Sequence, residues 1–166
     1  MPELIIALPK GRLQDAALAR LACARVRVNG AALASRRLAI ADETGRFRFI
    51  FVKPADVPVY VEHGIADCGV VGRDVLLESE ADVLQPLDLQ ISRCRIVVAA
   101  LTNASQDDHG MMHVATKYPR IAATHFGARG VTERKLCSGR SGTFAATIEY
   151  IKRDGRQRSQ APFKTL

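Results

Sequence analysis

The sequence predicts an α/β fold with a mainly parallel sheet, because short apolar runs alternate with amphipathic segments along most of the chain. Residues 4–9 (LIIALP) and 94–100 (CRIVVAA) are continuous apolar runs of strand length, which is typical of strands buried on both faces. In the segment 10–24, apolar residues recur at helical spacing. A chain of 166 residues is long enough for one ordinary domain or two small lobes.

The other predicted elements continue this alternation of strand and helix. The expected strands lie at residues 36–43, 46–52, 68–72, 83–90, 113–119 and 131–136. The expected helices lie within residues 10–24, at 56–63, from Asp74 onward and at 120–130. Residues 36–43 and 46–52 form either a hairpin or two adjacent strands. Residues 102–112 are predicted to form a loop.

The positive charge is concentrated toward the C-terminal end of the chain. The net charge is +7, and residues 134–166 hold eight basic and two acidic residues, which leaves +6 there and +1 for the first 133 residues. This basic segment shows no regular alternation of basic and aromatic residues and no nucleic-acid-binding motif, so we expect no nucleic-acid partner. No apolar run reaches about 18 residues, so no membrane span is predicted. Glu3 and the short apolar run after it favour a buried strand over a signal peptide.

The cysteines and histidines show no spacing that is typical of disulfides or metal sites. The four cysteines (Cys23, Cys68, Cys94 and Cys137) are far apart and form no CxxC pair. We expect them to be buried free thiols in a cytosolic protein. The four histidines also lack metal-ligand spacing, and we predict no metal-ligating residue.

Several polar residues are expected at the carboxyl ends of strands, where α/β folds bind their ligands. These residues are Lys10, Arg12, Lys53, Asp67 and Tyr118. After the first strand, a helix begins beside two cations, and the N–H groups at a helix start favour an anion. The sequence therefore predicts an anion-binding crevice.

Five motifs together resemble the ATP phosphoribosyltransferases, which catalyse the first step of histidine biosynthesis. The motifs are ALPKGRL (7–13), VKPADVPVYVEHGIADCGVVGRDVLLE (52–78), PLDL (86–89), CRIVVA (94–99) and VATKYPRIA (114–122). The resemblance covers residues 1–136 in the family's order, and the chain resembles the short form without a regulatory domain. It implies two α/β lobes, similar to a type II periplasmic binding protein, with the active site in the cleft.

The resemblance also implies an activity and partners. The family is a group of glycosyltransferases that move the phosphoribosyl group of phosphoribosyl pyrophosphate to N1 of ATP, release pyrophosphate and use Mg²⁺. We expect a cytoplasmic homo-oligomer and a hetero-oligomer with a regulatory subunit related to histidyl-tRNA synthetase. The alternative is a catalytically impaired remnant, or a pseudo-subunit, that binds nucleotide without turnover.

By this resemblance, Lys10, Lys53 and Asp67 are the catalytic candidates. Lys10 contacts phosphate, Lys53 stands where the family usually has Arg, and Asp67 orients a ribose hydroxyl or a base edge. The expected substrate-binding residues are Lys10, Gly11, Arg12, Arg36, Lys53, Asp67, Gly69, Gly72, Asp88, Lys117 and Tyr118. The structural alternatives are solvated cations for Lys10 and Arg12, a surface position for Arg36, a turn cap for Asp67, packing for Gly69 and Gly72, a loop carboxylate for Asp88 and a core tyrosine for Tyr118.

The resemblance ends near residue 136. The family continues with a Thr-Gly-x-Thr-type loop that cradles the 5-phosphate of phosphoribosyl pyrophosphate, and this loop is not recognisable here. Residues 138–143 (SGRSGT) form a small-residue segment without the acidic residue that precedes the family's loop. The sequence therefore predicts a first lobe at 1–93, an incomplete second lobe at 94–136 and a divergent basic tail at 137–166.

Overall fold

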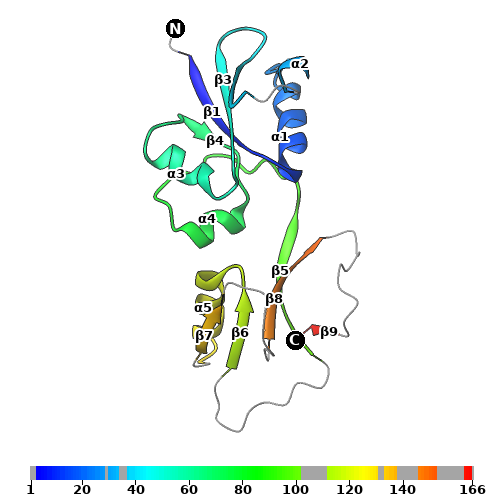
Figure 1. Cartoon of the computed structure of the whole chain (residues 1–166), viewed down its shortest axis with the longest axis vertical. Coiled ribbons are helices and arrows are strands. Elements are labelled where there is room, and N and C mark those ends of the chain that lie inside the picture. Colours follow the sequence, from blue (N-terminus) through cyan, green and yellow to red (C-terminus); the bar gives the residue numbers. More distant parts are fainter. Residues whose placement is uncertain are drawn as a thin grey trace. The chain divides into compact units, whose positions relative to one another are not determined.

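The chain divides into two compact units, each built around one β-sheet (Figure 1). The structure is a computed structural model, and it describes residues 3–28, 30–33, 37–101, 112–130, 133–137, 146–152 and 163–165. Unit 1 is Met1–Ser92 and unit 2 is Arg93–Leu166. Each unit combines a sheet with at least one described helix, so the predicted α/β class is confirmed.

The sheet of unit 1 has four strands in the order β2-β3-β1-β4. The strands are β1 (Leu4–Pro9), β2 (Ala39–Ala41), β3 (Phe47–Val52) and β4 (Cys68–Gly69). β1 runs parallel to both β3 and β4, and β2 pairs with β3 as an antiparallel hairpin. The parallel strands β3, β1 and β4 therefore end at the same edge of the sheet.

Helices cover both faces of this sheet, and Figure 1 shows α1 (Arg12–Cys23) and α3 (Asp56–Glu62) on opposite sides of β1. In β1, Ile6 and Leu8 pack with Ala17 of α1, whereas Ala7 packs with Val57 of α3. Because both faces of β1 are buried, the run LIIALP carries no polar position. The helices of unit 1 are α1 (Arg12–Cys23), α2 (Gly30–Leu33), α3 (Asp56–Glu62) and α4 (Arg73–Ser79).

The turn between β2 and β3 is organised by the buried carboxylate of Asp42. Asp42 Oδ2 accepts a hydrogen bond from Thr44 Oγ1 at 2.5 Å, and Asp42 Oδ1 accepts one from Phe47 N–H at 3.0 Å. Burial alone would raise the pKa of Asp42, but these hydrogen bonds and those from the Thr44 and Arg46 main chain outweigh it. The pKa of Asp42 is therefore lower than its ordinary value of 3.8.

The sheet of unit 2 has the order β7-β6-β8-β5-β9 and is packed against one described helix, α5 (Pro119–Gly127). β6 runs parallel to β7 and β8, whereas β5 runs antiparallel to β8 and β9. Val114 of β6 packs with Ala122 and Phe126 of α5 to form the core. The strands are β5 (Cys94–Leu101), β6 (Met112–Thr116), β7 (Glu133–Cys137), β8 (Ala146–Lys152) and β9 (Phe163–Thr165).

Several strand assignments differ from the sequence-based expectations. The strand predicted at 83–90 is wrong, because this segment runs between α4 and β5 without strand pairing, and its Pro86 has no N–H to donate to a ladder. The predicted strand 68–72 pairs only at Cys68–Gly69. Residues 137–166, assigned to a tail, contribute β8 and β9 to the sheet of unit 2.

The expectation of buried cysteines is also wrong for the three cysteines whose side chains are described. Cys23, Cys68 and Cys94 are all exposed. Each lies at an end of a helix or strand, where the chain leaves the core. None of the described helices has the length and apolar character that crossing a membrane would require.

Candidate functional site

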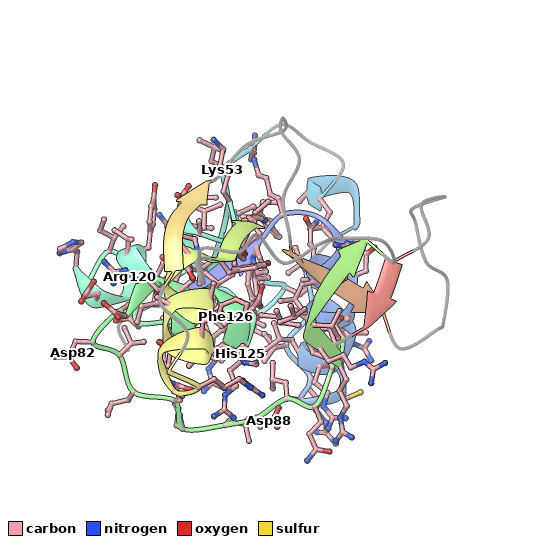
Figure 2. All side chains as sticks on the ribbon, turned by 90° about the horizontal axis from the view of Figure 1, so that it is seen from below. Lys53, Asp82, Asp88, Arg120, His125 and Phe126 are labelled. Atoms are coloured by element: carbon pink, nitrogen blue, oxygen red, sulfur yellow. The ribbon has the colours of Figure 1, made fainter. Side chains whose placement is uncertain are left out.

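Two lysines lie side by side at the carboxyl ends of neighbouring parallel strands. β1 ends at Pro9 and β3 ends at Val52, and these two residues are paired in the sheet register. Lys10 N–H donates to the Val52 carbonyl oxygen at 2.8 Å, so Lys10 leaves the sheet where Lys53 leaves it. Both lysines are exposed, and Figure 2 shows the Lys53 side chain extending away from the ribbon. We call Lys10, Gly11, Arg12 and Lys53 the cationic edge.

Gly11 shapes the join between β1 and α1. Its φ of 99° lies in the region that residues with a side chain rarely adopt. No heavy atom lies within 4 Å of the position that a Cβ would take, so conformation rather than space requires glycine there. The Gly11 carbonyl accepts from Gln14 N–H at 3.0 Å and so starts α1, whose first residue is the exposed Arg12. The start of a helix, which favours anions, therefore lies directly after Lys10.

A third loop runs toward the same edge from β4. Gly69 is paired with Ala7, and Val70 N–H donates to the Ala7 carbonyl at 2.9 Å. The chain then continues to Gly72, which precedes α4. A Cβ on Gly69 would lie 2.7 Å from Val57 Cγ1, which supports the packing interpretation of this glycine. A Cβ on Gly72 would collide with the carboxylate of Asp74, so that carboxylate lies over the start of α4.

Arg73 was not singled out from the sequence, but it occupies a comparable position. It is exposed and is the first residue of α4, directly after Gly72. The signal that singled out Arg12, a cation following a glycine at a strand-to-helix join, is also present here. Arg73 falls outside the helix predicted from the sequence, which begins one residue later, at Asp74.

Asp67 and Asp88 do not lie at the cationic edge. Asp67 precedes β4, so the expectation that it lies at the carboxyl end of a strand is wrong. Its Oδ2 accepts from Ile5 N–H at 2.7 Å, and the five residue-to-residue steps from Ile5 to Lys10 span about 16 Å of extended strand. Asp88 Oδ1 accepts from Gln90 N–H at 2.8 Å, and Figure 2 shows Asp88 well separated from Lys53 in unit 1.

In unit 2, Lys117 and Tyr118 follow the carboxyl end of β6. Tyr118 is only 9% exposed, its N–H donates to Thr116 Oγ1 at 2.9 Å, and its carbonyl accepts from Ala122 N–H at 3.0 Å. Lys117 Nζ lies 5.6 Å from the centre of the Tyr118 ring, which is a cation–π contact. This burial supports the interpretation of Tyr118 as a core tyrosine over that of a substrate-binding residue.

The remaining predicted site positions are not described by the structure. Arg36, residues 102–111 of the predicted loop and the segment 138–143 lie outside the described residues. Within the described part of the chain, no group of three or more His, Cys, Asp and Glu side chains could hold a metal ion.

Two hollows in unit 1 are formed by other residues than those of the cationic edge. The first has a volume of about 310 Å³ and is lined by Leu18, Ala19, Ala22, Arg27, Val28, Leu33 and Glu43. The second has a volume of about 370 Å³ and is lined by Arg20, Leu21, Cys23, Ala24, Leu87 and Leu89. An anionic ligand recognises positive charge, so the cationic edge suits such a ligand better than these mainly apolar hollows do.

Comparison with known proteins points to a single family. Residues 53–148, more than half of the chain, match the family model described as HisG, ATP phosphoribosyltransferase. This match extends past residue 136, where the resemblance read from the motifs ends, and it overlaps the start of β8.

Curated relatives and a solved structure agree with the family match. The chain is 45% identical over 130 residues to an ATP phosphoribosyltransferase of Halalkalibacterium halodurans (78% of this chain, 61% of that protein). It is 47% identical over 128 residues to one of Sorangium cellulosum (77% and 60%), so the chain spans about three fifths of their length. The structure is similar to one titled "ATP phosphoribosyl transferase (HisG:HisZ) complex from Thermotoga maritima", with 26% identity, a TM-score of 0.76, and 98% of this chain and 81% of that chain covered.

Proposed function

Because the chain belongs to the ATP phosphoribosyltransferase family, we propose that it transfers the phosphoribosyl group of phosphoribosyl pyrophosphate to N1 of ATP, the first step of histidine biosynthesis. One observation carries this proposal: the bond from Lys10 N–H to the Val52 carbonyl, which sets Lys10 and Lys53 side by side. Two polyanionic substrates repel each other in one site. Fixed cations and the N–H groups of a helix start offset this repulsion.

In this reaction, negative charge develops on the leaving pyrophosphate. A bond forms between N1 of ATP and C1 of the ribose, while the bond from C1 to the pyrophosphate oxygen breaks and its electron pair leaves with pyrophosphate. Negative charge therefore grows on the leaving group as the ribose becomes oxocarbenium-like. Lysines fixed beside phosphate oxygens stabilise this charge more strongly in the transition state than in the ground state. Lys53 supplies a point charge, where an arginine would supply a two-pronged hydrogen bond.

In this proposal, Mg²⁺ would bind together with the substrates. In phosphoryl and pyrophosphoryl sites, Mg²⁺ is usually held by one or two carboxylates and by substrate phosphates. The described residues form no cluster of three or more metal-ligating side chains, and Asp67 and Asp88 accept main-chain hydrogen bonds elsewhere. The described residues do not fit a resident magnesium site, so we assign no step of the reaction to one.

We further propose the architecture and partners that go with this function. The two compact units would correspond to the two lobes of a type II periplasmic-binding-protein-like fold. The Thermotoga maritima structure is titled as a complex of HisG with HisZ. We propose that this chain forms a cytoplasmic homo-oligomer and a hetero-oligomer with a regulatory subunit related to histidyl-tRNA synthetase.

A steady-state assay of phosphoribosyl-ATP formation tests the proposal. The full chain is assayed with and without the regulatory subunit, and we expect turnover that Lys10→Ala or Lys53→Ala lowers. Arg20→Ala is the matched control, because Arg20 is an exposed cation in the last turn of α1, away from the cationic edge. Calorimetric binding of ATP without product formation would instead favour the pseudo-subunit and remove the enzyme proposal.

A further inference from the structure

Asp67 binds the main chain of β1 at a position that the sheet ladder does not reach. The pairing between β1 and β4 begins with Ile6 opposite Cys68, one residue after Ile5. Ile5 N–H lies outside this ladder, and it donates to Asp67 Oδ2 at 2.7 Å. Asp67 N–H donates in turn to the Ile5 carbonyl at 2.9 Å. Asp67 therefore satisfies both the donor and the acceptor of Ile5, and its side chain replaces a missing main-chain acceptor.

This contact matters because β4 is a short edge strand. It has two residues and stands at the end of the strand order of its sheet. Beyond the ladder, Val70 N–H bonds the Ala7 carbonyl at 2.9 Å, so Asp67 and Val70 hold the two ends of the strand. A hydrogen bond from N–H to a carboxylate is stronger than one to a neutral acceptor. The Asp67 carboxylate therefore strengthens the contact between β1 and the amino end of β4.

The register of β4 determines where the following loop lies. From Asp67 the chain runs through Cys68 and Gly69 toward the edge at which β1 and β3 end, and it reaches Gly72 at the start of α4. A slip of one residue would move this loop by about 3.3 Å along the strand. Such a shift is as large as a hydrogen-bond distance, so contacts made by the loop would be lost.

We infer that Asp67 is a positioning residue: its carboxylate fixes β4 on β1 and thereby holds residues 70–72 and the start of α4 beside the cationic edge. Only the effect on ligand binding rests on the proposed function. The position of Asp67 supports the inference, because it lies at the amino end of β4, about 16 Å of strand from Lys10.

Hydrogen exchange of the Ile5 amide tests the contact without any ligand. The full chain is compared with Asp67→Asn, which keeps an oxygen acceptor, and with Asp67→Ala, which has none. We expect Ile5 exchange within about threefold of the parent rate in Asp67→Asn and at least about tenfold faster in Asp67→Ala. The Leu8 amide is the internal control, because Leu8 is paired with Phe51 of β3. Equal Ile5 exchange in the parent and Asp67→Ala would overturn the inference.

A second variant covers the case in which Asp67→Ala loosens the whole sheet and Leu8 also exchanges faster. Asp67→Glu keeps the charge but moves the carboxylate by one methylene. A positioning role predicts faster Ile5 exchange in Asp67→Glu at unchanged Leu8 exchange. Unchanged Ile5 exchange in that variant would count against the inference.

ATP affinity, measured by calorimetry on the same proteins, separates positioning from direct contact. A positioning role predicts that Asp67→Asn binds within about threefold of the parent and that Asp67→Ala binds about tenfold more weakly. A ligand contact made by the negative charge predicts that Asp67→Asn binds as weakly as Asp67→Ala while Ile5 stays protected, and this result would overturn the inference. If the parent chain binds no ATP, the proposed function fails, whereas the exchange data still decide the role of Asp67.

Discussion

The strand ends of the two units differ in how they present positive charge. In unit 1, Lys10 and Lys53 follow adjacent parallel strands, and a main-chain hydrogen bond fixes their starting points together. In unit 2, Lys117 follows β6 alone and lies against the buried ring of Tyr118. A lysine after a strand is common to both ends. The cationic edge differs from the end of β6 because it has two exposed cations beside a helix start. Two such cations are a stronger basis for anion binding than one.

Removing both charges from the cationic edge should give the largest effect. We expect Lys10→Ala/Lys53→Ala to weaken binding of phosphoribosyl pyrophosphate or ATP about hundredfold or more, because each hydrogen bond to a charged group contributes about 1.5–3 kcal/mol. Calorimetry at low ionic strength measures this, and Lys117→Ala should lose only about three- to tenfold. Arg20→Ala again serves as the control. Equal losses in Lys117→Ala and the double variant would erase the contrast between the two units.

A methyl group at Gly69 should destabilise unit 1, while the same change at Gly127 should not destabilise unit 2. A Cβ at Gly69 would lie 2.7 Å from Val57 Cγ1 and 3.2 Å from the Ala7 carbonyl oxygen, whereas a Cβ at Gly127 meets nothing within 4 Å. We expect Gly69→Ala to lower the free energy of unfolding by about 1–3 kcal/mol. Gly127→Ala lies within α5 and should be neutral or stabilising by up to about 1 kcal/mol. Urea unfolding, followed by amide signals of each unit, checks both values.

The parts of the fold that the sequence predicted well are those whose local pattern is enforced by burial. Helices or neighbouring strands cover β1 and most of β3, so both strands are largely apolar. The ends of these two runs identify Lys10 and Lys53 from the sequence alone. The segment 83–90 alternates like a strand but finds no partner strand, so its Leu84 remains 94% exposed. Alternation alone cannot reveal whether a partner exists.

The parts that the sequence did not predict depend on contacts between distant residues. The bond between Ile5 and Asp67 joins residues 62 positions apart, so nothing local indicates that Asp67 serves the sheet rather than a ligand. β8 lies in a basic segment that was assigned to a tail, and its pairing with β5 and β6 is what makes it a strand. Arg73 was missed for a smaller reason, an error of one residue in the start of α4.

The contact between Lys117 and Tyr118 should give a small but measurable coupling. A double-mutant cycle with Lys117→Ala and Tyr118→Leu, read from urea unfolding, should yield about 0.5–1 kcal/mol, the range for an exposed cation–π pair. Tyr118→Phe keeps the ring and should preserve the coupling. The matched pair in unit 1 is Arg46 with Phe47, where the guanidinium carbon lies 5.8 Å from the ring centre. Zero coupling for Lys117 and Tyr118 would mean that the ring does not orient this cation.

The smallest expected effect is a difference between the two units in how much stability they lose at low pH. Among the described residues, Asp42 of unit 1 is the buried carboxylate, and its folded-state pKa is lower than 3.8. A carboxylate with a lowered pKa contributes stability that is complete above the unfolded-state pKa and is lost as the pH falls through the folded-state pKa. Between about pH 5 and pH 2, unit 1 of the parent chain should therefore lose stability. The contribution of Asp42 to this loss should be absent from Asp42→Asn. Exchange of the Phe47 amide, which donates to Asp42 Oδ1 at 3.0 Å, measures this loss directly, with the Val114 amide of unit 2 as the control. An acid response of Phe47 that persists in Asp42→Asn would assign it to other carboxylates, because the asparagine at position 42 cannot titrate.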